Sequence, residues 1–212
     1  MYDIKSRFLS LLLSLPALLL ALTVHEYAHG WTADKMGDPT ARYSGRLSLN
    51  PLAHMDLFGT VCLLFFGFGW ARPVPINTRN FRNSKWGTVA VSLAGPGANF
   101  ILALICAFVV SAMEKFVPAN TLTQFLYTVV YMGVQLNVGL MVFNLIPIPP
   151  LDGSKVLMEF LPPKYRFKMY TLERYFSIIL LALIFFNILT PLLSVLRGWV
   201  LTVIYFIVGL VF

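Results

Sequence analysis

The chain has 212 residues, of which 58% are hydrophobic and only 12% are charged, and its mean hydropathy is +0.76. A soluble domain carries about 25% charged residues, so the composition excludes a water-soluble globule and predicts that most of the chain lies in lipid. The formal charge of +7 is assigned to the loops of a membrane protein, where Lys and Arg gather, and not to nucleic-acid binding. We expect one integral membrane domain over residues 1–212.

The first predicted span is an apolar run over residues 8–24, whose helical pattern continues to about residue 33. Pro16 interrupts this run, and lipid tolerates a kink where neighbouring groups satisfy the freed carbonyl. The sequence Gly-Asp-Pro at 37–39 then ends the helix. Nothing in this run resembles a segment to be cleaved, so we expect the mature protein to keep it.

The segment that follows has a different character. Residues 40–43 and 46–49 are predicted to be short strands of a hairpin. Residues 60–68 are apolar but too few to span a bilayer, so they are predicted to be a re-entrant or interfacial piece. Residues 72–76 contain two prolines and are predicted to be an extended edge segment, because proline cannot serve in a central strand.

Three more spans are predicted over residues 86–113, 122–145 and 175–196, and a shorter apolar run over 199–212 could cross in part. A basic amphipathic connection over 155–174 joins the third span to the fourth. We therefore expect an all-α polytopic membrane protein. It has about five to six transmembrane helices and a short re-entrant or β-hairpin segment between the first two spans.

The basic residues predict the orientation. Residues 34–86 carry seven of the 16 Lys and Arg, and residues 153–174 carry five more. The positive-inside rule places both segments in the cytoplasm and the N-terminus outside. Lys5 and Arg7 argue against this orientation, because they are basic residues near the N-terminus. The four basic residues assigned to the outer side are Lys5, Arg7, Lys115 and Arg197.

The end of the first run carries the sequence H-E-Y-A-H at residues 25–29. Residues four apart lie on one helix face, so His25 and His29 can reach the same metal ion. Glu26 is turned by about 100° around the helix axis from His25, and it can act on a water molecule at the metal. The alternative is an amphipathic helix with solvated side chains. The 17-residue apolar run that leads into the motif weighs against it, because ionisable groups inside a membrane are costly and mark function.

A catalytic zinc needs three protein ligands and one open position. Most of the nine acidic residues lie in polar loops or beside basic residues, which leaves Asp152 as the candidate in apolar surroundings. It follows a proline-rich break over residues 147–150, and a helix broken at membrane depth must line a cavity or pack in protein. The alternative for Asp-Gly after Pro-Pro is an ordinary turn.

Three motifs together resemble the site-2 protease family of intramembrane zinc metalloproteases. They are H-E-Y-A-H at 25–29, G-P-G-A-N at 95–99 and N-L-I-P-I-P-P-L-D-G at 144–153. The similarity is to the small branch without PDZ or CBS domains. It implies that His25, His29 and Asp152 bind one zinc ion per chain and that Glu26 is the catalytic base. It also implies regulated cleavage of transmembrane substrate proteins, within or near their spans, in a prokaryotic cell membrane.

Two further residues are candidates for contact with the substrate. The resemblance places Asn144 near the metal, where its amide could bind substrate or the oxyanion; the alternative is a bond to a neighbouring helix backbone. His54 could handle substrate or a proton, or it could cap an interfacial turn.

A helical substrate must be unwound before cleavage, because each carbonyl is bonded to the amide four residues on. Segment 72–76 could hold the unwound stretch by strand addition. Two other functions stay open at this point. One is a membrane-anchored metallopeptidase that cuts soluble peptides. The other is a zinc-binding transporter or receptor, although the chain has no internal repeat of the kind seen in transporters and such a protein has no use for Glu26.

Overall fold

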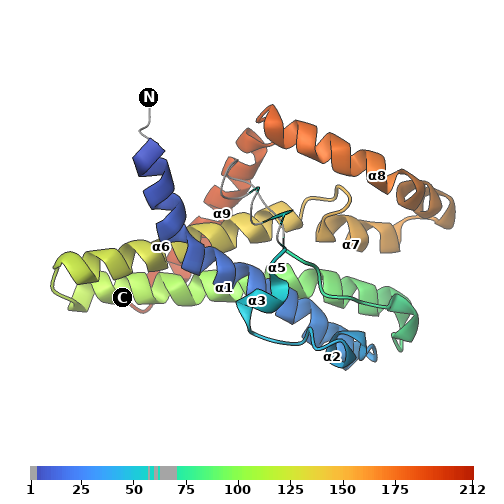
Figure 1. The fold of residues 1–212 in the computed structure, drawn as a ribbon, viewed down its shortest axis with the longest axis horizontal. Coiled ribbons are helices and arrows are strands. Elements are labelled where there is room, and N and C mark those ends of the chain that lie inside the picture. The colour runs from blue at the N-terminus through green and yellow to red at the C-terminus, as the bar shows by residue number, and fades with distance from the viewer. Residues whose placement is uncertain (1–3, 57, 60–61, 63–70) are drawn as a thin grey trace.

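A computed structural model describes residues 4–56, 58–59, 62 and 71–212 (Figure 1). Within these residues the chain forms helices and one isolated antiparallel bridge between Met55 and Ala71, with no strand ladder. The helices are α1 (Ile4–Met36), α2 (Thr40–Tyr43), α3 (Pro51–His54), η1 (Thr78–Asn80), α5 (Ser84–Phe116), α6 (Thr121–Asn144), α7 (Asp152–Phe160), α8 (Pro163–Phe185) and α9 (Thr190–Gly209). The predicted all-α class is confirmed.

Four stretches of helix in the described part of the chain are long and apolar enough to cross a membrane. They are Leu12–Met36 in α1, Ser84–Phe116, Thr121–Asn144 and Thr190–Gly209. The first three agree with the predicted spans to within a few residues. Pro16 and Pro96 lie inside α1 and α5 without ending them, as a membrane setting allows.

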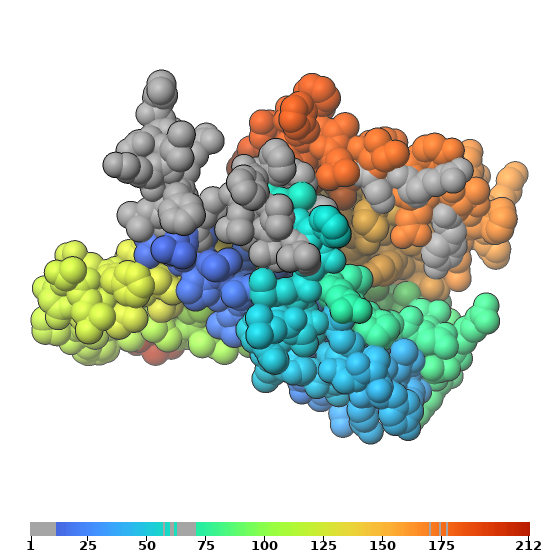
Figure 2. All heavy atoms as spheres, viewed as in Figure 1, coloured from blue at the N-terminus to red at the C-terminus, as the bar shows by residue number. Residues whose placement is uncertain are grey.

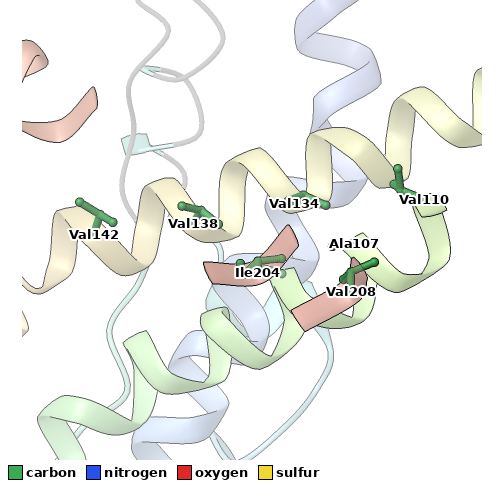
Figure 3. Packing of buried hydrophobic residues seen from close by; sticks show 8 residues of the cluster. Ala107, Val110, Val134, Val138, Val142, Ile204 and Val208 are labelled. Atoms are coloured by element: carbon green, nitrogen blue, oxygen red, sulfur yellow. The ribbon is translucent and has the colours of Figure 1, made fainter. Parts of the chain in front are cut away.

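Helices α5 and α6 run side by side in opposite directions, and α1 crosses them (Figure 1). Small and β-branched side chains from α5, α6 and α9 fill the contact (Figure 3). Lipid supplies no hydrophobic drive for helix association, so close packing of small residues holds such bundles together. The buried members are Ala103, Ala107, Val110, Val134, Val138, Val142, Ile204 and Val208.

Contacts between distant segments define the two ends of the bundle. At one end, Arg82 N donates to Met36 O (3.0 Å), and Lys85 Nζ lies 4.4 Å from the ring centre of Phe160. The end of α1, the start of α5 and the end of α7 therefore lie together. At the other end, Lys115 Nζ donates to Phe212 O (3.0 Å), so the C-terminus lies beside the turn between α5 and α6. Figure 2 shows α2 and α3 on the same face as the start of α5.

The predicted strand over residues 40–43 is wrong, because these residues form the short helix α2. The Asp38 carboxylate accepts hydrogen bonds from the backbone N (3.2 Å) and the hydroxyl of Thr40, a local turn that competes with extended structure. Residues 46–49 form no strand either. The predicted re-entrant piece over 60–68 falls almost wholly outside the described residues.

The predicted span over 175–196 is also wrong. Helix α8 ends at Phe185, Asn187 has a positive φ of 56°, and α9 begins at Thr190 with a proline in its first turn. The break between α8 and α9 at residues 186–189 therefore lies inside the predicted span. Arg197, assigned from the sequence to the outer side, lies inside a candidate span.

Candidate metal centre

His25 and His29 lie one turn apart near the end of α1, as their spacing predicts, and both are buried. Their rings meet edge to face with centroids 4.6 Å apart. The two Nε2 atoms are 3.0 Å apart. Both rings therefore present the same nitrogen to one point.

Asp152 reaches this point from the first residue of α7. Its Oδ2 lies 3.3 Å from His25 Nε2 and 3.1 Å from His29 Nε2. The broken segment after α6 turns the chain back on itself there, and it can do so because Gly153 has no side chain: a Cβ atom would lie 2.2 Å from Leu145 O. The predicted helix break thus delivers the carboxylate to the two imidazoles.

The charge state of Asp152 suits a metal ligand. The positive charge of Lys155 beside Asp152 favours the ionised carboxylate, which is the form that binds a metal. Lys155 Nζ lies 3.0 Å from Oδ1. One carboxylate oxygen therefore faces the imidazoles and the other faces a cation.

Helix α5 fixes which ring nitrogens carry protons. His29 Nδ1 lies 2.7 Å from Val91 O, which can only accept. His25 Nδ1 lies 2.6 Å from Asn99 Oδ1, and the Asn99 amide nitrogen donates to Ala21 O (3.1 Å) and to Asn137 Oδ1 (2.7 Å). Both Nδ1 atoms therefore donate, and in the neutral rings both Nε2 atoms carry lone pairs.

Two lone pairs and a carboxylate oxygen facing one point repel each other unless a cation lies between them. The three donor atoms lie within 4.8 Å of one another. Two imidazole nitrogens and a carboxylate oxygen are also a usual ligand set for catalytic zinc. In the described part of the chain this is the one group of three or more His, Cys, Asp or Glu side chains that could hold a metal ion, so the residues present fit zinc.

Gly95 lets α5 approach the two rings. A Cβ atom at this position would lie 2.5 Å from His29 Nε2 and 2.6 Å from His25 Cε1, and real side chains do not tolerate such contacts. Val91, Gly95 and Asn99 are spaced four apart, so they form one stripe along α5. This stripe is the wall of the metal centre behind the imidazoles.

Glu26 lies in the same cavity, of about 620 Å³, but outside the group of three donors. Its Oε2 accepts a hydrogen bond from Val74 N (2.9 Å). The carboxylate is thus oriented by the backbone of the predicted edge segment. The arrangement separates the carboxylate of Glu26 from that of Asp152, as their predicted roles require.

The edge segment is fixed at both ends. At its start, Arg72 N donates to His54 O (2.8 Å). At its end, the buried Asp38 carboxylate accepts from Asn77 N (2.6 Å) and Asn80 Nδ2 (2.7 Å). Burial would raise the pKa of Asp38, but hydrogen bonds from Thr40, Asn77 and Asn80 lower it overall.

The two predicted substrate-contact residues, Asn144 and His54, differ in position. Asn144 lines the metal cavity, and its Nδ2 donates to Leu140 O of its own helix (3.0 Å). His54 is not among the residues that line this cavity. Its ring is buried with Nε2 2.7 Å from Ser48 O, and its backbone carbonyl anchors the edge segment. A role for either side chain in contact with substrate stays a prediction.

The wall formed by α5 was not predicted from the sequence. The motif G-P-G-A-N at 95–99 contains the available signal, because the spacing of four places Gly95 and Asn99 on one face of a helix. The part played by Val91 has no signal in the sequence, because its contribution is a backbone carbonyl.

Comparisons with known proteins identify the family of the chain. The chain matches Peptidase family M50 over residues 14–125 and 112–187. It is 44% identical to "Putative zinc metalloprotease YwhC" of Bacillus subtilis over 172 residues, 78% of this chain and 77% of that protein. It is 32% identical to "Putative zinc metalloprotease Rip2" of Mycolicibacterium smegmatis over 151 residues, 69% of this chain and 56% of that protein. The Rip2 protein of Mycobacterium tuberculosis is 29% identical over 202 residues, 91% of this chain and 71% of that protein. No solved structure matches the chain.

The family match extends over most of the chain and includes the stretches that carry all three motifs. The chain therefore belongs to peptidase family M50, the site-2 protease family, and it is a zinc metalloprotease.

Proposed function

We propose that this zinc metalloprotease hydrolyses peptide bonds within or near the membrane-spanning segments of other membrane proteins, as in regulated intramembrane proteolysis. One observation carries the proposal. His25, His29 and Asp152 converge in a cavity that Glu26 also lines, and the walls of this cavity come partly from the candidate spans α1, α5 and α6. A site so placed can receive a peptide bond from the membrane.

We assign His25, His29 and Asp152 as the ligands of one zinc ion. When bound, zinc polarises a carbonyl group and lowers the pKa of a water molecule toward about 7. The hydrogen bonds from Nδ1 to Asn99 and Val91 keep both imidazoles turned with Nε2 toward the ion.

Glu26 acts as the general base and then as the general acid. Its carboxylate accepts the proton of the attacking water and passes it to the leaving amine. The hydrogen bond from Val74 N leaves the other carboxylate oxygen for this proton transfer. Lys155 faces the cavity beside Asp152 and keeps that carboxylate ionised, which preserves it as a ligand.

The edge segment limits how an unwound substrate can pair. Pro73 and Pro75 have no backbone N–H, and Arg46 Nη2 donates to Arg72 O (2.7 Å) and Pro73 O (3.4 Å). The Val74 N–H donates to Glu26, so a substrate strand would pair with groups near Ile76 or replace one of these bonds. A substrate strand added here would therefore run directly beside the catalytic base.

We place the basic segments at the cytoplasmic face of a prokaryotic membrane, with the metal centre nearer that face. The contacts of Met36 with Arg82 and of Lys85 with Phe160 support this placement, because they hold the two basic segments at one end of the bundle. The predicted five to six crossings stay a proposal: α8 is the described helix that would add to the four candidate spans.

The test is to map the cleavage site. The purified protein is reconstituted in vesicles with single-span host proteins, and the products are analysed by mass spectrometry with and without a zinc chelator. Cuts within or next to the apolar span, abolished by the chelator, are the expected result. Cuts confined to water-exposed loops far from the span would favour a metallopeptidase that acts at the membrane surface.

A further inference from the structure

A second polar site lies away from the metal, between α6 and α9. Arg197 Nη2 donates to Gln135 Oε1 (3.1 Å). Arg197 is the eighth residue of α9, so it lies about 10 Å from one end of this helix and about 18 Å from the other. Gln135 lies about 21 Å and about 14 Å from the ends of α6. Both residues are thus near the middle of candidate membrane spans.

This pair opens onto a groove of about 300 Å³ between α1, α6 and α9. Leucine and phenylalanine side chains form most of its surface, and Gly139 lies within it. A Cβ atom at Gly139 would meet no atom within 4 Å, so there is space above the helix backbone. The groove therefore combines an apolar surface with one cation and one amide.

Among the described residues, the Arg197 guanidinium has no counter-charge. In the part of the chain that the structure describes, Arg197 forms no ion pair with a carboxylate, and Gln135 offers it only a neutral oxygen. A charged side chain at mid-membrane is costly, and such residues pair with a partner or belong to a functional site. An acidic group in the groove would supply the partner.

The groove and the metal cavity lie next to each other along α6. Leu136 and Leu140 line the groove, and Asn144, the next residue at a spacing of four, lines the metal cavity. Along α1, Leu18 of the groove is seven residues, or about 10 Å, from His25. Along α6, Gln135 is nine residues, or about 14 Å, from Asn144. One extended ligand can occupy both sites.

We propose that the groove binds the membrane-spanning helix of the substrate, and that Arg197 and Gln135 recognise an Asp or Glu side chain on it. This acidic residue lies about seven to nine residues from the scissile bond where the intervening stretch is helical, on the side away from the basic segments. The depth favours a side chain over a lipid phosphate, because phosphates lie at the membrane surface. The inference rests on the proposed function in that it places the scissile bond at the metal centre.

The first experiment measures binding without cleavage. The Glu26→Gln protein is placed in phosphatidylcholine vesicles with labelled leucine-rich single-span peptides, and binding is followed by energy transfer. Asp is moved along the peptide and compared with Leu at each position. We expect Asp at one position to tighten binding about three- to thirtyfold, the range for polar contacts between membrane helices. Equal binding of the Asp and Leu peptides at every position would overturn the proposal, and this comparison needs no change in the groove.

Variants then assign the effect to the groove. Arg197→Gln should abolish the preference for Asp, and Arg197→Glu should transfer it to a peptide with Lys at the same position. Lys115→Gln is the matched control, because it removes one positive charge from the far end of α5 and should keep the preference. Loss of the preference in the control as well, or its retention in Arg197→Gln, contradicts the assignment.

Cleavage of the same peptides by the unaltered protein separates this inference from the proposed function. Binding that depends on position and on Arg197, with no peptide cut, would refute intramembrane proteolysis and leave the docking site standing. Cleavage that is indifferent to Asp and to Arg197→Gln would leave the protease standing and refute the docking site. If Arg197→Gln reduces only the binding of labelled phosphatidylglycerol, the groove is a lipid site and the proposal is wrong.

Discussion

Two walls of the metal cavity are built in different ways. One is the stripe Val91, Gly95 and Asn99 of α5, a regular helix whose polar contacts to the histidine rings are 2.6 and 2.7 Å long and buried. The other is the edge segment over residues 72–76, which contacts Glu26 through one backbone amide. The first wall fixes the predicted metal ligands and the second orients the predicted base.

The two kinds of wall suit different parts of the reaction. A long helix in a packed bundle cannot shift one residue without shifting its neighbours, so it suits ligands that must stay within a few tenths of an ångström. The edge segment is not part of a helix and is held by separate hydrogen bonds at its ends and at Val74, so it can adjust to a substrate. We therefore expect changes in α5 to alter zinc binding, and changes in the segment to alter turnover with zinc retained.

The largest effect is expected from Glu26→Gln, which removes the base and keeps the size of the side chain. Peptide hydrolysis should fall about 10²–10⁴-fold, while zinc content, measured by atomic absorption, stays at one per chain. Asp152→Ala is the contrasting variant and should lose zinc as well. If Glu26→Gln loses zinc, Glu26 supports the metal and the division between the two walls fails.

Gly95→Ala tests the α5 wall directly. The new methyl group would overlap both imidazoles, and overpacking of this kind costs about 1–3 kcal/mol, so zinc should bind about five- to 150-fold more weakly. Gly97→Ala is a matched control on the same helix, because a Cβ atom there meets nothing within 4 Å. Equal zinc affinity of the two variants would show that α5 does not confine the rings.

A comparable loss is expected from Asn99→Leu, which removes the partner of His25 Nδ1. Loss of such a partner weakens metal binding about 10- to 100-fold. A merely structural role would lower stability and leave the ring tautomer unchanged, so the readout is the nitrogen NMR spectrum of labelled His25 along with zinc affinity. Asn120→Ala, at the far cap of α6, should reduce stability and leave both unchanged. An unaltered His25 tautomer in Asn99→Leu would reject the positioning role.

The sequence predicts the centre better than its walls. His25 and His29 could be paired because residues four apart lie on the same face of any α-helix. Asp152 could be found because an ionised carboxylate next to a broken membrane span is costly unless it has a partner. The α5 stripe depends on which face of a helix meets its neighbour, and that is decided by packing over the whole bundle. Residues 40–43 and 175–196 were mispredicted for a related reason: hydrogen bonds to Asp38 and a turn at Asn187 override the local hydrophobic pattern.

The smallest effect is expected from Asp38→Asn, which weakens the hydrogen bonds that hold the end of the edge segment. The carboxylate accepts bonds from Thr40, Asn77 and Asn80, so the substitution should cost about 1–3 kcal/mol locally and speed the exchange of the Val74 and Asn77 amide protons. Turnover should fall while zinc affinity stays unchanged. Asp34→Asn is the matched control. It removes the same charge, but the partner of Asp34 is Arg42 and not a residue next to the edge segment, so turnover should stay unchanged.

The lowered pKa of Asp38 predicts that the local stability of the edge segment depends on pH. Because its folded-state pKa is lowered from 3.8, the contribution of Asp38 to stability is complete above about pH 4 and is lost as pH falls through the lowered value. Exchange of the Asn77 amide proton, corrected for the intrinsic effect of pH, should therefore accelerate below about pH 4 in the unaltered protein and change less in Asp38→Asn. If Asp38→Asn weakens zinc binding as much as Asn99→Leu does, the segment also holds the metal ligands, and the two walls act as one.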